Sequence, residues 1–143
     1  MAKPLPHQLD SQRYPHRHLV PTRFSDLDPN NHINNVALAG IIEDGRVRLH
    51  RDAGWYAPEL GVQIMLASLT VEYLAQSHYP LDITVLSGVG RVGRSSLDVE
   101  QLVMQEGLCV AYARSVVVFV EDGAAVPLPG DVLARLDRWK LTQ

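Results

Sequence analysis

One long helical segment, residues 35–53, is the feature that most constrains the fold of this chain. It holds no proline, its first half is almost wholly apolar, and its last turns are rich in basic side chains. Asn34 or Asn35 can cap its start, basic groups suit the C-terminal end of a helix dipole, and Gly54 suits the turn that ends a helix. We expect a helix that is buried nearly all round over its apolar first half.

Most of the remaining chain has the character of strands. We expect one strand before the helix, four after it and a short last helix, at residues 18–24, 62–76, 81–92, 95–105, 108–120 and 131–140 in that order. Turn signals such as Glu106-Gly107 separate the later strands, which indicates antiparallel hairpins. Strands gathered after one apolar helix indicate an α+β fold, in which the helix covers one face of the sheet.

Length and composition fit a single domain. A chain of 143 residues leaves no room for a second core, so we expect a flexible N-terminal arm at residues 1–14 and one domain over residues 15–143. The formal net charge of -3 disfavours general nucleic-acid binding. The single cysteine, Cys109, cannot form an internal disulfide, and its apolar neighbours indicate a buried structural thiol.

The chain shows neither a signal-peptide pattern nor an apolar run long enough to span a bilayer. A cytoplasmic location without a membrane partner is therefore expected. His7, His16 and His18 have no cysteine or acidic residue beside them at ligand spacing, so we expect solvated histidines rather than a metal site.

Residues 26–35, with the sequence DLDPNNHINN, form the densest polar cluster. They join the first expected strand to the start of the long helix, where unpaired backbone N–H groups can bind an anion or stabilise a developing oxyanion. A carboxylate, a histidine and several asparagines at this point are compatible with a hydrolytic site. Aspartate and asparagine also favour loops and helix caps for local reasons, so the residues alone leave both interpretations open.

The same cluster carries a family resemblance. Residues 23–35 contain the pattern D-x-D-x-x-x-H-x-N-N, which resembles the signature of hotdog-fold acyl-CoA thioesterases of the 4-hydroxybenzoyl-CoA thioesterase type. Residues 81–85 leading to residues 91–96 are similar to a second stretch of that family, and residues 127–129 resemble its usual ending. The resemblance extends over residues 20–136.

This resemblance implies both a fold and an activity. The fold is a curved antiparallel sheet wrapped around one long central helix, and two chains pair edge to edge, with dimers often pairing into tetramers. The activity is hydrolysis of acyl-CoA thioesters to free acid and CoA at sites formed where the two chains meet. Neither a metal nor a cofactor is implied, because CoA is part of the substrate.

The resemblance also assigns roles to residues of the polar cluster. Asp28 matches the catalytic carboxylate, which acts as a nucleophile or as a general base toward water. The backbone N–H around Asn35 would polarise the thioester carbonyl. His32 and Asn34 would orient the substrate or a neighbouring side chain, or support the turn.

Further candidates lie outside the cluster. Arg91, Arg94 and Ser95 are candidates for binding CoA, because arginine suits phosphate geometry; both arginines could equally be solvated charges at strand ends. Glu43, on the long helix, is the alternative catalytic carboxylate, because a second group of hotdog thioesterases uses a glutamate there. It could instead pair with a nearby arginine or face solvent.

Two other functions of the same fold stay open. A hotdog enoyl-CoA hydratase carries an aspartate and a histidine before its helix, which Asp28 and His32 loosely match. A non-catalytic acyl-binding module would hold the ligand intact. A Ser-His-Asp hydrolase is unsupported, because the chain has no G-x-S-x-G elbow. Residues 36–39 are aliphatic and small where many relatives have an aromatic side chain, so the acyl pocket is expected to suit flat aromatic groups less well.

Overall fold

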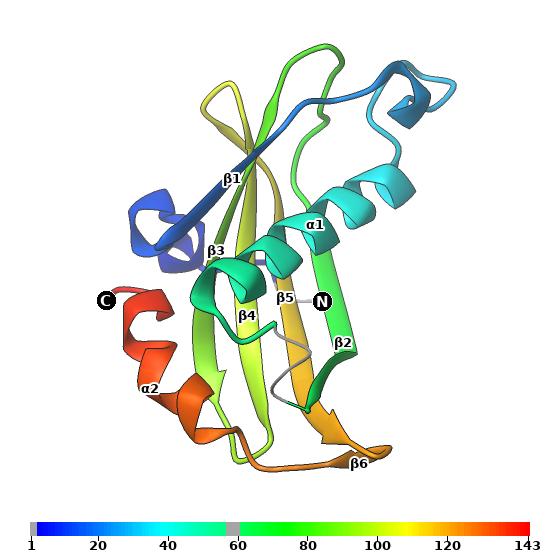
Figure 1. Ribbon diagram of the computed structural model, residues 1–143. Helices are drawn as coiled ribbons and strands as arrows, with labels where there is room; N and C mark the ends of the chain where they lie inside the picture. Colours follow the sequence, from blue (N-terminus) through cyan, green and yellow to red (C-terminus); the bar gives the residue numbers. More distant parts are fainter. Residues whose placement is uncertain (1–2, 57–60) are drawn as a thin grey trace.

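A curved antiparallel sheet wraps around one long helix in the computed structural model, which describes residues 3–56 and 61–143 (Figure 1). The helix is α1 (Asn35–Ala53). The strands are β1 (His16–Val20), β2 (Gln63–Tyr73), β3 (Ile83–Val92), β4 (Ser96–Gln105), β5 (Leu108–Glu121) and β6 (Ala124–Ala125). Their order is β1-β3-β4-β5-β2, with β6 paired to β5, so β1 and β2 form the two long edges. The predicted α+β hotdog architecture is confirmed.

The predicted bounds of α1 are confirmed. They could be predicted because the residues that cap the helix are recognisable in the sequence. The side chain of Asn34 accepts a hydrogen bond from the backbone N–H of Val36 at 2.8 Å, and Gly54 ends the helix with a φ of 82°. A shorter helix, α2 (Gly130–Trp139), closes the chain where residues 131–140 predicted one. None of the described helices combines the length and the hydropathy needed to cross a membrane.

The first strand begins and ends earlier than predicted. It covers His16–Val20 rather than residues 18–24, and a 3-10 helix, η3 (Phe24–Asp26), takes the place of its expected end. The carboxylate of Asp26 accepts a hydrogen bond from the backbone N–H of Arg23 at 3.1 Å, which closes a turn that a strand cannot hold. The short strand β6 was not predicted.

The expectation that the first half of α1 is buried nearly all round is wrong. Val36 is 80% exposed, whereas Leu38 and Ile42 are buried against the sheet. The helix covers one face of the sheet, and no described element packs over its outer side. Gly45 allows close approach to the sheet, because a Cβ there would lie 2.5 Å from Val85 Cγ1; a Cβ at Gly40 would meet nothing within 4 Å.

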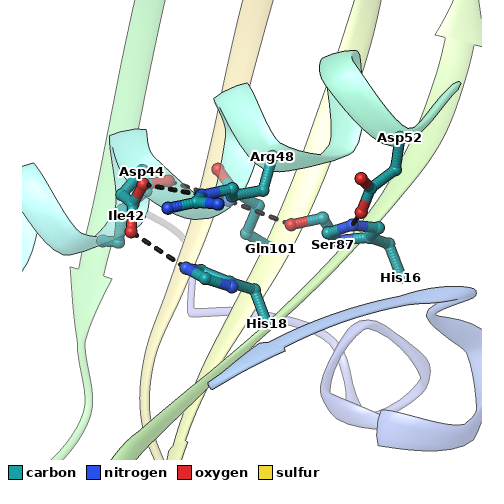
Figure 2. A network of polar contacts seen from close by, with 8 residues as sticks. All are labelled: His16, His18, Ile42, Asp44, Arg48, Asp52, Ser87 and Gln101. Atoms are coloured by element: carbon teal, nitrogen blue, oxygen red, sulfur yellow. Dashed lines mark hydrogen bonds and ion pairs between the residues drawn. The ribbon is translucent and has the colours of Figure 1, made fainter. Parts of the chain in front are cut away.

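Two ion pairs attach the edge strand β1 to α1, as Figure 2 shows. His16 Nε2 lies 2.7 Å from Asp52 Oδ2, and His18 Nε2 lies 2.9 Å from Asp44 Oδ2. Arg48 Nε lies 3.4 Å from the other oxygen of Asp44. His16 is buried, so the expectation that these histidines are solvated is wrong for it. Because β1 leads into the polar cluster, these contacts fix where that loop starts.

The N-terminal segment makes contacts that the sequence did not predict. Two 3-10 helices, η1 (Pro6–Leu9) and η2 (Ser11–Arg13), lie in the part expected to be a flexible arm. Tyr14 packs with Leu86, Leu102 and Tyr112 in a buried cluster on the sheet face away from α1. Arg13 Nε donates to the carbonyl of Thr142 at 2.8 Å, so both ends of the chain meet on this face.

Candidate active site

Asp28 is held by the backbone of its own loop. Its Oδ1 accepts hydrogen bonds from the N–H of Asn30 at 2.8 Å and from the N–H of His32 at 3.1 Å. Its own N–H donates to the carbonyl of His32 at 2.8 Å, and Asn31 turns the chain with a φ of 61°. Oδ1 is therefore fixed, while Oδ2 has no hydrogen-bond partner among the described residues. The half-buried carboxylate is oriented with one oxygen left for chemistry.

Asp26, the other carboxylate of the motif, stabilises the loop. It is buried, and its Oδ1 lies 2.8 Å from Arg23 Nη2. The hydrogen bond from Arg23 holds the pKa of this carboxyl below its usual value. The carbonyl of Asp26 accepts from the N–H of Asn34 at 2.7 Å, which ties the start of the loop to the start of α1. Asp26 thus holds the loop closed around Asp28.

The start of α1 presents an unused donor beside a cavity. Asn34 caps the helix through Val36, so its side-chain oxygen is occupied. The N–H of Asn35 has no hydrogen-bond partner among the described residues. A cavity of about 240 Å³ adjoins it, and its lining residues are Ile33, Asn35, Leu38, Tyr73, Leu74, Ala75, Gln76 and Ser77. The cavity lies between the first turn of α1 and the chain that follows β2, and Asp28 is not among its lining residues.

His32 is partly fixed by an aromatic contact. Its ring lies 5.3 Å from that of His78 in an edge-to-face arrangement. His78 is itself held by Gln105, whose side chain exchanges two hydrogen bonds of 2.8 Å with the His78 backbone. Together with its backbone bonds to Asp28, this contact places His32 in support of the loop.

The arginines predicted to meet CoA lie far from this loop in one chain. Arg91 lies at the end of β3, and Arg94 and Ser95 lie in the turn between β3 and β4, at the opposite end of the sheet from the loop that holds Asp28 (Figure 1). Arg91 Nη2 lies 3.7 Å from Asp98 Oδ1, which gives this guanidinium an internal partner. The structure therefore does not bring these three residues together with Asp28 within a single chain.

Residues 22–136 match the family model of the Thioesterase-like superfamily. The chain belongs to this superfamily. No curated protein matches it. The fold, the polar loop and the helix start described above are thus those of a thioesterase-like protein.

Solved structures agree with this assignment. A thioesterase from Thermus thermophilus, complexed with coenzyme A and Zn, is 30% identical with a TM-score of 0.81, over 90% of this chain and 96% of that one. A predicted thioesterase from Bacillus stearothermophilus is 27% identical with a TM-score of 0.81, over 90% and 98%. A Pseudomonas aeruginosa protein is 26% identical with a TM-score of 0.83, over 92% and 96%.

Glu43, the alternative carboxylate of this thioesterase-like protein, is exposed on α1. It follows Asn35 by eight residues, or ~12 Å along a helix. Within the described residues it forms no ion pair, and Arg48 pairs with Asp44 instead. In a single chain Glu43 is therefore too distant to serve a carbonyl held at the N–H of Asn35.

The sequence missed the far wall of the cavity. This wall is the end of β2 with residues 74–77, which carry no polar motif. Its contacts with the start of α1 come from distant parts of the chain: the N–H of Ile33 donates to the carbonyl of Ser77 at 2.9 Å, and the Tyr73 hydroxyl donates to the carbonyl of Asn35 at 3.4 Å. Backbone pairing between segments so far apart in the chain leaves no local pattern in the sequence.

Proposed function

We propose that this thioesterase-like protein hydrolyses acyl-CoA thioesters to free acid and CoA, with Asp28 as the reacting carboxylate. The supporting observation is the orientation of Asp28: two backbone donors fix Oδ1 and leave Oδ2 unpaired, in the loop that leads directly into the unpaired N–H at the start of α1. The similarity to a thioesterase complexed with coenzyme A supports CoA as the thiol portion.

The chemistry needs an attacking oxygen and a stabilised oxyanion. As a general base, the Asp28 carboxylate takes a proton from water while the water oxygen attacks the thioester carbon; as a nucleophile, it forms an acyl anhydride that water then opens. In both routes the carbonyl oxygen gains negative charge, which the N–H of Asn35 and the helix dipole stabilise. The C–S bond breaks, and the CoA thiolate leaves and takes up a proton.

We propose that the reacting carboxylate is the loop aspartate rather than a helix glutamate, as in the 4-hydroxybenzoyl-CoA thioesterase type. Support comes from Glu43, which lies on an exposed part of α1 while Asp28 is held in place. The side chains after Asn35 are small and aliphatic, so an aliphatic acyl group is the expected substrate rather than a flat aromatic one.

A homodimer formed through β2 completes this proposal. The edge strand β2 exposes apolar side chains, including Met65 at 52% and Tyr73 at 46%, and unprotected edges of this kind invite pairing. A two-fold axis across the middle of β2 would reverse the partner strand. The 240 Å³ cavity at the end of one β2 would then lie beside the partner's larger cavity of about 570 Å³, which Trp55, Tyr56 and residues 61–65 line at the start of β2.

A thiol-release assay over a panel of short, medium, long-chain and aryl acyl-CoAs tests the activity. We expect release of free CoA, fastest with aliphatic acyl groups. An acyl-binding module would retain intact acyl-CoA and release no thiol. A hydratase would consume an enoyl-CoA without releasing thiol, and either result would overturn the proposal.

A further inference from the structure

Two buried N–H donors on one flank of α1 have no acceptor. Arg46 is 4% exposed and His50 is 2% exposed, and among the described residues neither Arg46 Nη1 nor His50 Nε2 has a hydrogen-bond partner. The two residues are four apart, so their side chains are neighbours on the same flank of the helix. Buried polar groups in native proteins are nearly always hydrogen-bonded, so two neighbouring donors without acceptors need an explanation.

The proton on His50 is located by its neighbour Trp55. Trp55 Nε1, which can only donate, lies 2.6 Å from His50 Nδ1. Nδ1 is therefore the acceptor, and the ring proton is on Nε2. Burial, with the nearby charge of Arg46 adding to it, lowers the pKa of His50 to about 3, so the ring is neutral and its Nε2–H is a donor.

Arg46 carries a positive charge that forms no ion pair with any described residue. No described residue forms a hydrogen bond with it either. Burial lowers the pKa of Arg46, and the opposite charge of Glu43 offsets only part of that effect. Glu43 is exposed and does not reach an ion pair with Arg46. An unpaired buried charge is costly, and proteins keep such a group where a ligand supplies the opposite charge or where water is bound.

Two buried acceptors in this region also lack a partner, and one of them belongs to His16, which itself contributes to the lowered pKa of His50. Within the part of the chain that the structure describes, Gln101 Oε1 and His16 Nδ1 have no partner, while Gln101 Nε2 donates to the carbonyl of Ile42 at 2.9 Å and to Ser87 Oγ at 3.1 Å (Figure 2). Buried water can satisfy such neutral acceptors. Water does not neutralise a guanidinium. Bound water therefore accounts for the acceptors of Gln101 and His16 but not for the charge of Arg46.

Arg46 lies on the same side of α1 as Asn35 at the helix start. It follows Asn35 by eleven residues, which is close to three whole turns, so both residues point to the same side of α1, ~16 Å apart along the axis. Long side chains on a helix lean toward its N-terminus, which brings the guanidinium back toward Asn35. Further along this flank, Trp55 contacts His50 and also lines the 570 Å³ cavity.

We propose that Arg46 and His50 bind the distal end of the acyl group, and that the preferred substrates are ω-carboxyacyl thioesters. A terminal carboxylate supplies a negative charge for the guanidinium and acceptors for both N–H donors. This specificity rests on the proposed thioesterase activity, with the thioester held at Asn35 and the acyl chain running along the flank of α1 toward Arg46.

Chain-matched pairs of substrates test the specificity. Thiol release is measured for butyryl-, hexanoyl- and octanoyl-CoA against succinyl-, adipoyl- and suberoyl-CoA, with the wild type, Arg46→Met and Arg46→Lys. We expect the wild type to favour one ω-carboxy substrate by about tenfold or more in kcat/KM, Arg46→Met to lose that preference mainly through KM, and Arg46→Lys to keep part of it. Arg48→Met removes the same charge from an exposed position on α1 and should leave the preference intact.

A binding measurement separates this inference from the activity. Free adipate or suberate at constant ionic strength should raise the Tm of the wild type and of Arg48→Met, but not that of Arg46→Met, and hexanoate should have little effect. If dicarboxylates bind through Arg46 while no acyl-CoA releases thiol, the subsite stands and the proposed function falls. If thiol is released with equal preference by wild type and Arg46→Met, and dicarboxylates leave the Tm unchanged, the donors of Arg46 and His50 bind no carboxylate and the inference is overturned.

Discussion

At the residue scale, Asp26 and Asp28 show how one short motif holds two carboxylates in different surroundings. Asp26 is buried and Arg23 contacts both of its oxygens, whereas Asp28 is half-buried and its Oδ2 has no partner in residues 3–56 and 61–143. A carboxylate whose oxygens are all engaged cannot attack a carbonyl or take a proton from water. We therefore propose Asp28 for the chemistry, while the contacts of Asp26 with Arg23 hold the loop in place.

Replacing Asp28 should remove the chemistry and leave the fold. We expect Asp28→Asn to lower kcat by ~10²-fold or more, because the amide is neither a nucleophile nor a base, while it can still accept the two backbone hydrogen bonds through its oxygen. Glu43→Gln should have a much smaller effect. Steady-state thiol release and circular dichroism check both variants. A dead Glu43→Gln beside an active Asp28→Asn would move the enzyme to the helix-glutamate type.

Replacing Asp26 should lower stability in a pH-dependent way. We expect Asp26→Asn to reduce the free energy of unfolding at pH 7 by up to about 1 kcal/mol, because the ion pair with Arg23 is lost and solvent around the exposed guanidinium screens that contact. The folded pKa of Asp26 lies below its unfolded value of about 4, so its stabilisation is present above that pH and disappears as the pH falls through the folded pKa.

Urea unfolding of wild type and Asp26→Asn from pH 7 down to pH 3 measures this effect. The difference between the two proteins should shrink as the solution becomes more acidic. A difference that stays constant, or that grows toward pH 3, would mean that the carboxylate of Asp26 is not held in its ionised form by Arg23.

At the element scale, two glycines of α1 make a matched pair. A Cβ at Gly45 would lie 2.5 Å from Val85 Cγ1, whereas a Cβ at Gly40 would meet nothing within 4 Å. We expect Gly45→Ala to lower the free energy of unfolding by about 1–3 kcal/mol through overpacking, and Gly40→Ala to raise it by up to about 1 kcal/mol through helix propensity. Thermal unfolding of both variants under the same conditions measures the difference. Equal shifts would show that α1 does not approach the sheet at Gly45.

The elements that the sequence predicted well are those whose limits depend on local chemistry. The cap of Asn34 and the left-handed turn at Gly54 fix α1, so its bounds could be predicted. The first strand could not be, because a turn closed by the side chain of Asp26 replaced its end. The burial of α1 could not be predicted either, since apolar residues such as Val36 show that a helix prefers to be covered but not what covers it.

The candidate site follows the same division. The motif located Asp28 and His32 on the loop and Asn35 at the start of the long helix, and the structure places them there. The environment of Arg46 and His50 had no sequence signal, because an arginine and a histidine near the end of a helix look like ordinary charges that favour the helix dipole. Trp55, which comes later in the chain, covers His50 through a side-chain hydrogen bond that the helix sequence does not indicate.

At the scale of the whole molecule, the long edge strand β2 has one side that no strand of the same chain covers in the described residues. It pairs with β5 on one side only, and apolar side chains along it, Leu69 among them, are exposed. In a β2-to-β2 dimer, a charged side chain at Leu69 would lie near the two-fold axis and face its own copy, so like charges would repel. We expect Leu69→Lys to shift the protein toward monomer and to reduce thiol release in the same concentration range.

Leu133→Lys is the matched control, because Leu133 is also exposed but lies on α2, away from β2. Light scattering over a dilution series, with activity measured at each concentration, gives the assembly and its link to catalysis in one experiment. If Leu69→Lys and Leu133→Lys both keep the wild-type mass and activity, β2 is not the contact between chains. If Leu69→Lys becomes a fully active monomer, each chain carries a complete site, and the shared cavity of the proposed dimer is wrong.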